Sequence, residues 1–95
     1  MSAAQPGPIH SAIESKLREQ FAPDRLTVID ESHRHEGHSG ARPGGESHFR
    51  VEIVAAAFAG VSRTERHRRV HRALATELEG GVHALALRLL APGES

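Results

Sequence analysis

The first clear pattern of hydrophobic positions lies near the start of the chain. Apolar residues recur at every fourth position from Ile9 to Phe21, which places them along one side of an α-helix and leaves the charged residues for the solvent side. Pro23 and Asp24 follow as a turn sequence, and a helix does not continue into the residue before a proline. We therefore predict an amphipathic helix over 9–21.

Three segments have the composition of β-strands. Leu26 to Asp30 is short and rich in β-branched residues, and His48 to Val54 alternates between apolar and polar positions. Val82 to Leu90 is the most apolar segment, and His83 shares its predicted face with the leucines. Between the first two strands, Glu31 to Ser47 is rich in glycine and histidine and has almost no apolar residue, which predicts a long loop.

A second helix is predicted between the last two strands. Ala55 to Gly60 is expected to be a short connection with a single helical turn around Phe58. Ser62 and Glu65 then have the spacing of a capping box, which marks the start of a helix. Apolar residues continue along one side as far as Leu78, where two glycines follow. This periodicity favours one continuous helix.

The order of these elements predicts a small mixed sheet. A loop joins the first two strands, so they should pair antiparallel, whereas a helix joins the second and third, so these should run parallel with a right-handed crossover. We expect a single-domain α+β fold with a three-stranded mixed sheet and the helices on one face. Parallel strands start at the same edge, so His48 and His83 should lie close together.

Histidine is the unusual component of this sequence, with eight among 95 residues. His33, His35 and His38 lie in the predicted loop, which ends at the edge where His48 and His83 are expected. Neutral imidazole is a common ligand for borderline metals, so this edge is a candidate metal corner. In the alternative interpretation, the loop histidines are solvated polar residues and His83 is a structural residue at the start of a strand.

Composition narrows the classes of function. Twelve basic residues balance twelve acidic ones, so the chain as a whole is not a polycation. The absence of cysteine excludes disulfides, a thiolate nucleophile, a self-contained zinc finger and an iron–sulfur cluster held on the chain's own thiolates. We see no signal peptide and no membrane span, and expect a cytoplasmic protein without membrane contact. Nucleotide-binding and nucleophile motifs are also missing, so we expect no enzymatic activity.

The predicted second helix is strongly basic. Its clustered arginines are Arg63, Arg66, Arg68, Arg69 and Arg72. After a short turn, such a helix can place arginines on DNA phosphates or on an acidic partner, or it can simply form a solvated face. His67 and His71 have the spacing for metal binding from one helix face, but they flank the apolar stripe, which favours partial burial.

Several short strings, in a fixed order, resemble those of the BolA family. They are Asp30-Glu31-Ser32-His33, Gly45-Glu46-Ser47-His48-Phe49, Phe58-x-Gly60-x-Ser62, Arg66-His67-Arg68 and Val82-His83-Ala84-Leu85. The resemblance covers residues 9–92, which we take as the domain, between flexible ends at 1–8 and 93–95. It implies an α-β-β-α-α-β fold similar to class II KH domains, in agreement with the order of elements that the periodicity predicts.

The resemblance also implies partners and a cofactor. Members of the BolA family form heterodimers with monothiol glutaredoxins, share a [2Fe-2S] cluster with the partner and its glutathione, and act in iron–sulfur cluster trafficking or iron regulation. Carried over to this chain, His83 is one cluster ligand and His35 the other, with His38 or His33 as alternatives. The isolated chain is expected to bind no cluster. Some bacterial members are DNA-binding regulators of stress response and cell morphology, which here implies the segment Phe58–Leu78 as an alternative functional surface.

Overall fold

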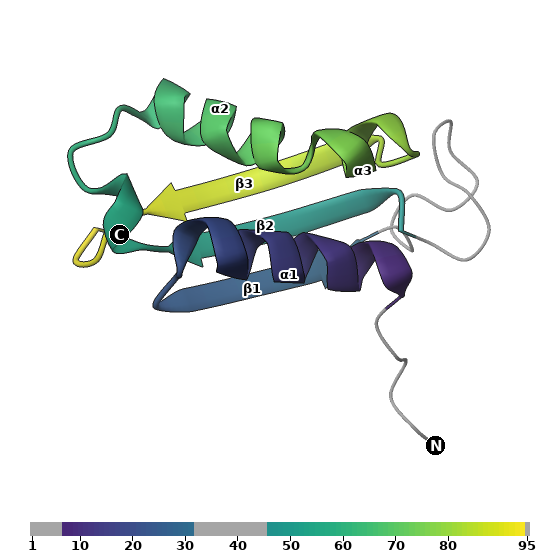
Figure 1. The fold of residues 1–95 in the computed structure, drawn as a ribbon, viewed down its shortest axis with the longest axis horizontal. Helices are drawn as coiled ribbons and strands as arrows, with labels where there is room; N and C mark the ends of the chain where they lie inside the picture. Colours follow the sequence, from purple (N-terminus) through teal and green to yellow (C-terminus); the bar gives the residue numbers. More distant parts are fainter. Residues whose placement is uncertain (1–6, 32–45, 95) are drawn as a thin grey trace, which may run out of the picture.

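The order of helices and strands agrees with the sequence pattern. The computed structural model of the 95-residue chain describes residues 7–31 and 46–94. Its elements are α1 (Pro8–Phe21), β1 (Arg25–Asp30), β2 (His48–Val54), the 3₁₀ turn η2 (Ala56–Phe58), α2 (Arg63–Ala73), α3 (Ala75–Glu79) and β3 (Ala84–Leu90) (Figure 1). Within these residues, no helix is long and apolar enough to cross a bilayer.

Helix α1 buries the apolar stripe that its periodicity predicts. The buried residues are Ile13, Leu17 and Phe21. The helix ends at Ala22, which adopts a left-handed conformation with φ 44° and donates its N–H to the Arg18 carbonyl at 3.0 Å. This contact satisfies one of the carbonyls left unpaired at a helix end, immediately before Pro23.

The three strands form one sheet in the order β1-β2-β3. β1 pairs antiparallel with β2, and β2 pairs parallel with β3, so that His48 lies opposite Ala84. Both predicted pairings are confirmed. The end of β1 and the starts of β2 and β3 consequently meet at one end of the molecule. We call this the histidine edge and define it by His48 and His83.

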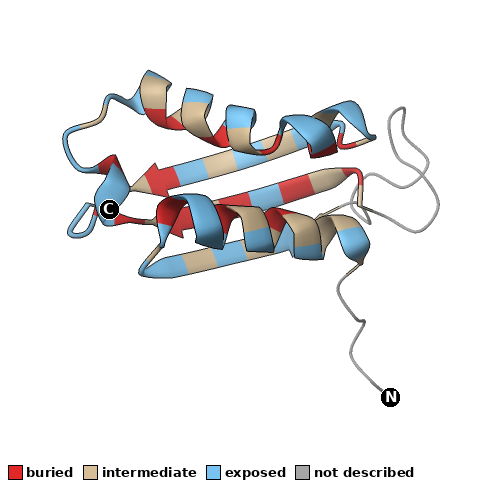
Figure 2. Ribbon diagram, viewed as in Figure 1, coloured by how far each residue is buried: buried red, intermediate tan, exposed pale blue. Residues whose placement is uncertain are grey.

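The core lies between the helices and one face of the sheet (Figure 2). Along β2 the residues Phe49, Val51 and Ile53 are buried, whereas the residues between them are exposed or only partly buried. Phe58 on η2 is also fully buried and packs against Phe21, with ring centroids 5.1 Å apart. The helices therefore cover one face of the sheet, as predicted.

The crossover contains two helices rather than the single helix that the periodicity favours. Leu74, with φ −106° and ψ 19°, separates α2 from α3. After this break, the Glu77 carboxylate is buried and accepts hydrogen bonds of 2.8 and 3.0 Å from Lys16 Nζ on α1. The apolar stripe did not reveal the break, because Leu74 at the break and Leu78 after it both continue the stripe.

Glu94, the last of the described residues, is hydrogen-bonded to the folded unit, and the flexible tail expected at 93–95 stays a prediction. Glu94 accepts hydrogen bonds of 2.6 and 3.0 Å from the Arg66 guanidinium and one of 2.8 Å from the Ala91 N–H. Glu94 also donates its own N–H to the Ala91 carbonyl at 3.0 Å. A charged side chain of α2 thus anchors the residues that follow β3.

Candidate functional site

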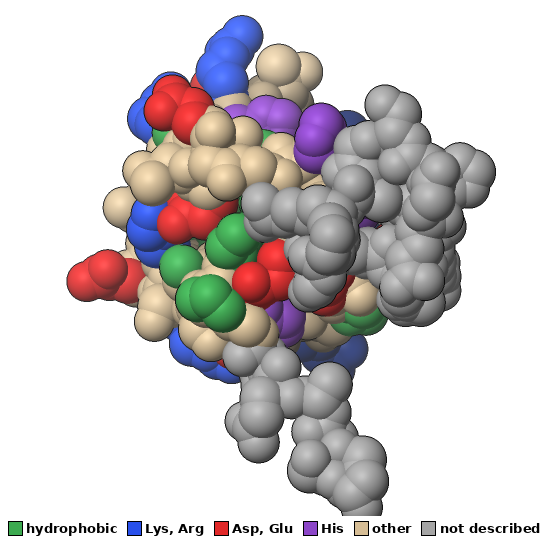
Figure 3. Space-filling view, turned by 90° about the vertical axis from the view of Figure 1, so that its right-hand side faces the viewer, with side chains coloured by type: hydrophobic (Ala, Val, Ile, Leu, Met, Phe, Trp, Pro, Cys, Tyr) green, Lys and Arg blue, Asp and Glu red, His purple; other side chains and the backbone are tan. Residues whose placement is uncertain are grey.

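The fold brings His48 and His83 together, as the predicted topology requires. Their ring centroids are 6.2 Å apart and the ring planes differ by 14°. His48 is the first residue of β2 and is partly buried, whereas His83 directly precedes β3 and is exposed. Figure 3 looks onto this end of the molecule and shows histidine side chains at its surface. Two imidazoles from distant parts of the sequence therefore share the histidine edge.

Ser47 connects these two histidines. It is fully buried, and its carbonyl accepts the N–H groups of His83 at 2.7 Å and Ala84 at 3.2 Å. Its hydroxyl lies 2.9 Å from His48 Nδ1, within hydrogen-bonding distance. No role for Ser47 was predicted from the sequence, although its position beside His48 in the Gly-Glu-Ser-His string was a signal. One buried residue thus orients the ring of His48 and the backbone of His83.

Both ends of the predicted histidine loop are fixed at the same edge. The Glu31 N–H donates to the His48 carbonyl at 2.7 Å, and the Glu46 N–H donates to Asp30 Oδ2 at 2.9 Å. Glu46 has φ 63°, a left-handed conformation that is uncommon for residues other than glycine. Three candidate ligands lie outside the described residues: His33, His35 and His38.

The Glu46 carboxylate also contacts the N-terminus of α1. Its Oε2 accepts the His10 N–H at 2.9 Å, and a Cβ at Gly7 would collide with this carboxylate. A negative acceptor at this position satisfies a helix N–H that lacks an intrahelical partner and complements the helix dipole. The His10 side chain contributes a second link, because its Nε2 lies 2.8 Å from the Val28 carbonyl of β1. The residue that ends the loop is therefore tied to the helix layer.

Arg66 is a structural residue rather than a surface one. It is only 8% exposed, and its guanidinium donates to the carbonyls of Val61 and Leu89 as well as to Glu94. The hydrogen bond to Glu94 raises the pKa of Arg66, while the hydrogen bonds from Arg66 and from the Ala91 N–H lower the pKa of Glu94 to about 2. These hydrogen bonds commit Arg66 largely to the fold, and its assignment to a partner or nucleic-acid surface stays a prediction.

The remaining arginines of α2 reach the solvent. They are Arg63, Arg68, Arg69 and Arg72. Arg69 and Arg68 donate to the Glu65 carboxylate at 3.2 and 3.3 Å, and these hydrogen bonds lower the pKa of Glu65. His67 is partly buried as expected, whereas His71 is exposed. The exposed basic face is thus partly neutralised by an acid on the same helix.

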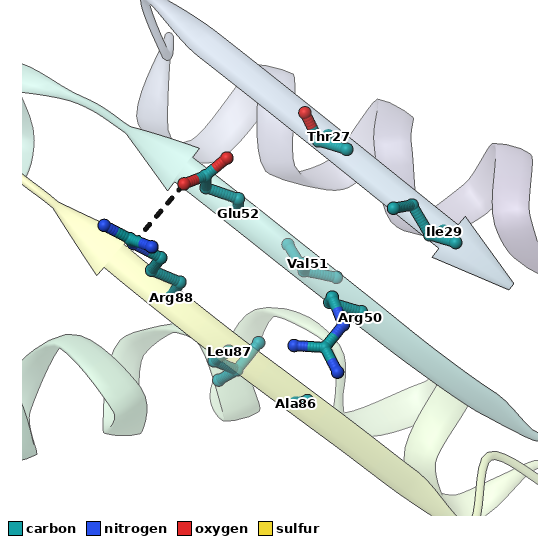
Figure 4. A pocket seen from close by; sticks show the side chains of 8 residues that line it. All are labelled: Thr27, Ile29, Arg50, Val51, Glu52, Ala86, Leu87 and Arg88. Carbon is teal, nitrogen blue, oxygen red and sulfur yellow. Dashed lines mark ion pairs between the residues drawn. The ribbon is translucent and has the colours of Figure 1, made fainter. Parts of the chain in front are cut away.

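The face of the sheet opposite the helices holds a shallow depression of about 240 Å³. Figure 4 shows Ile29 from β1, Arg50 and Glu52 from β2 and Arg88 from β3 around it. Ile29 is 44% exposed, and Arg88 forms an ion pair of 3.4 Å with Glu52. No role for this surface was predicted from the sequence. Its lining combines an exposed apolar side chain with charges that are largely paired within the sheet.

These observations define a class of protein: a small α+β domain on a mixed three-stranded sheet, with its distinctive side chains at one sheet edge and on a basic helix. The family model for BolA-like protein matches residues 17–94. The chain belongs to this family, and the resemblance seen in the sequence is confirmed.

Individual relatives agree with this assignment. The chain is similar to the human "BolA-like protein 1", with 46% identity over 88 residues, but its match covers only 61% of that protein's length against 93% of its own. It is 40% identical over 86 residues to the "DNA-binding transcriptional regulator BolA" of Haemophilus influenzae, covering 90% of this chain and 80% of that protein. The solved BolA domain of SufE1 from Arabidopsis thaliana has a TM-score of 0.84 and 38% identity, with coverage of 94% and 98%.

Proposed function

We propose that this chain is an interaction protein that pairs with a monothiol glutaredoxin and helps to hold a bridging [2Fe-2S] cluster, in iron–sulfur cluster trafficking or in iron and redox regulation. The observation that carries this proposal is the exposed imidazole of His83 at the edge where both ends of the histidine-rich loop are anchored. His83 would be one ligand and His35 the second, with His38 or His33 as alternatives. The proposal suits a family whose members are in general not enzymes.

The available donors fit a shared cluster rather than a self-contained one. A [2Fe-2S] cluster takes four ligands, usually thiolates, and two of the four can be replaced by histidines on one iron. This chain has no cysteine, and no three metal-ligating side chains come together in the part that the structure describes. The missing thiolates must therefore come from a partner, which the glutaredoxin cysteine and glutathione would supply. When bound, the cluster would supply one-electron chemistry and transferable iron and sulfide.

The chain's own residues would hold neutral imidazoles in place. The Ser47 carbonyl fixes the backbone of His83, and the contacts at Glu31 and Glu46 fix the two ends of the loop that carries the second ligand. Only a neutral imidazole can bind iron, so the complex should lose its cluster in acid. Histidine in place of thiolate also raises the reduction potential, which suits sensing or transfer better than storage.

The test is a co-reconstitution of this chain with a monothiol glutaredoxin of the same organism, iron, sulfide and glutathione. We expect a one-to-one complex by native mass spectrometry and a visible circular dichroism spectrum distinct from that of the glutaredoxin homodimer. His83→Ala should abolish that spectrum, and His35→Ala should do so unless His38 or His33 replaces it. His71→Ala, which removes an exposed histidine on α2, is the matched control. An unchanged cluster lifetime in the His83 variant would refute the assignment.

A second candidate function, DNA-binding transcriptional regulation, is favoured by the exposed arginines of α2 and by the name of the Haemophilus influenzae relative. Replacing Arg68 and Arg72 with glutamine should flatten the salt dependence of DNA affinity, because each lost phosphate contact lowers the slope of log affinity against log salt by roughly one. Glu65→Gln should strengthen binding by removing an opposing charge. A slope that none of these changes alters would rule out α2 as the DNA-binding surface.

A further inference from the structure

We infer that the outer edge of β3 binds an extended peptide segment of a partner protein, which adds to the sheet as a fourth strand. The segment would carry apolar side chains at the positions that face the helices and an acidic side chain opposite Arg88. This surface goes beyond the proposed function, because it needs neither a cluster nor the histidines of the loop. Two observations support it: a run of unpaired backbone groups on β3 and an exposed arginine on the same strand.

The backbone of β3 uses alternate residues to bind β2. At the end of this parallel pairing, the Leu90 carbonyl accepts the Ala55 N–H at 3.0 Å. Residues two apart along a strand direct their backbone groups to the same neighbour, so the intervening residues face away from β2. The Leu89 carbonyl confirms this alternation, because it accepts from Arg66 Nη1 at 3.0 Å on the outer side. The outward-facing residues of β3 are therefore Leu85, Leu87 and Leu89.

Two neighbouring residues of this edge keep both of their backbone groups open. Among the described residues, none forms a hydrogen bond with the N–H or the C=O of Leu85 or Leu87. The opposite edge of the sheet differs, because the outward carbonyl of Val28 in the middle of β1 lies 2.8 Å from His10 Nε2. Unpaired strand edges are templates for pairing with another chain. β3 thus offers two complete residue positions to an added strand, whereas β1 is interrupted at its centre.

The helix side of this edge is apolar and incompletely covered. In the view of Figure 1, α2 runs along the side of β3 that faces away from β2. Three leucines near this edge pack against the core but are only partly buried: Leu78 on α3 and Leu85 and Leu87 on β3. An added strand would place every second side chain on this face. Apolar residues at those positions would extend the burial of the three leucines.

The other face of the edge favours an acidic residue. Arg88 lies on this face, and its side chain is 60% exposed (Figure 4). Within residues 7–31 and 46–94 its one ion pair is with Glu52, at 3.4 Å, and a guanidinium group has five N–H donors. Opposite charges across a strand pair are stabilising, whereas like charges are destabilising. A glutamate opposite Arg88 therefore suits this position, and a lysine does not.

The test is the binding of a synthetic peptide to the full chain, without glutaredoxin, iron or sulfide, so that its outcome is separate from that of the proposed function. The probe is acetyl-Thr-Val-Glu-Val-Thr-Val-Thr-amide, whose glutamate would pair antiparallel with Arg88 and whose next two valines would pair with Leu87 and Leu85. NMR titration measures the affinity, and amide hydrogen exchange reports on the edge. We expect saturating peptide to slow exchange of the Leu85 and Leu87 amides at least about tenfold, and to leave the paired amide of Ala86 unchanged.

Variants of the chain and of the peptide identify strand pairing as the cause. Leu85→Pro removes an outward N–H but no hydrogen bond to β2, and should weaken binding at least about tenfold; Leu85→Ala keeps this N–H and should weaken it less than about threefold. N-methylation of the two valines that pair with β3 should abolish binding, whereas N-methylation of the glutamate, whose N–H would face away from β3, should not. Arg88→Glu should make the chain prefer a peptide with lysine in place of glutamate.

Several results would overturn the inference. They are no binding of the peptide, unchanged exchange of the Leu85 and Leu87 amides on binding, or equal effects of Leu85→Pro and Leu85→Ala. Equal binding of the two N-methylated peptides would do the same. This last comparison uses the wild-type chain, so it decides the question even if the proline variant does not fold.

Discussion

The buried carboxylate of Glu77 has a partner that is easy to remove. Glu77 is 9% exposed and accepts both of its hydrogen bonds from Lys16 Nζ, so this ion pair joins α1 to α3. Lys16→Met keeps the aliphatic part of the side chain but removes the cation. We predict that this variant is destabilised, because it leaves a buried charge uncompensated.

The expected cost is set by the burial of both partners. Breaking a fully buried ion pair costs about 3–5 kcal/mol. The Lys16 side chain is 37% exposed, so water can partly replace its ammonium group, which lowers our expectation to about 2 kcal/mol. In a domain of this size, that loss corresponds to a decrease in Tm of roughly 8–16 °C. Lys16→Met combined with Glu77→Leu removes both charges and should recover most of the lost stability.

Urea unfolding followed by circular dichroism measures these free energies. Arg18→Met is the matched control, because Arg18 forms an ion pair of 3.2 Å with Glu14 on the exposed side of the same helix and both partners are more than a third exposed. It should cost no more than about 0.5 kcal/mol. If Lys16→Met costs no more than this control, or if the double variant is as unstable as Lys16→Met alone, the reasoning about the buried carboxylate is wrong.

Three other contacts have measurable consequences. The hydrogen bonds that Glu94 accepts lower its pKa from 4.5 to about 2. Ionised Glu94 therefore stabilises the folded state above pH 4.5, and this stabilisation is lost as the pH falls from 4.5 to 2. The Tm difference between the wild type and Glu94→Gln should therefore be largest near neutral pH and shrink between pH 4.5 and 2; a constant difference would contradict this. Gly7→Ala should displace the Glu46 carboxylate from α1 and cost about 0.5–2 kcal/mol in urea unfolding. Its effect should not add to that of Glu46→Ala, because both variants break the same contact between the Glu46 carboxylate and α1. Full additivity would show that Gly7→Ala does not act through this contact. Phe58→Ala should cost about 3–5 kcal/mol in urea unfolding, a large part of the roughly 5–14 kcal/mol available to such a domain; a cost below about 1 kcal/mol would show that the core closes around the gap.

Local patterns predicted most of the fold because they depend on neighbouring residues. The alternation of His48–Val54 gave both ends of β2, and the connections between the strands gave the mixed sheet. The contacts of buried Glu77 and Arg66 depend instead on residues far apart in the sequence. Glu77 lies 61 positions from Lys16, and Arg66 lies 28 positions from Glu94. Nothing in the local sequence distinguishes Arg66 from the exposed arginines beside it.

The candidate site could also be predicted from the sequence only in part. The proximity of His48 and His83 was predicted because it follows from strand direction alone. The supporting contacts of Ser47 and Glu46 were not predicted, because they depend on side-chain orientation and on a left-handed backbone conformation that the local sequence does not indicate. The choice of His35 as the loop ligand stays a prediction.

The anchoring of the loop at its two ends has an evolutionary consequence. Hydrogen bonds from Glu31 and Glu46 to residues outside the loop hold its ends in register. The entropy of closing a loop rises slowly with length, by about 0.6 kcal/mol for each doubling. Insertions, deletions and exchanges of donor type between these two anchors are therefore inexpensive for the rest of the domain. Natural selection can vary the length and chemistry of this segment while the sheet and helices stay constant, so one scaffold can present different side chains at the same edge.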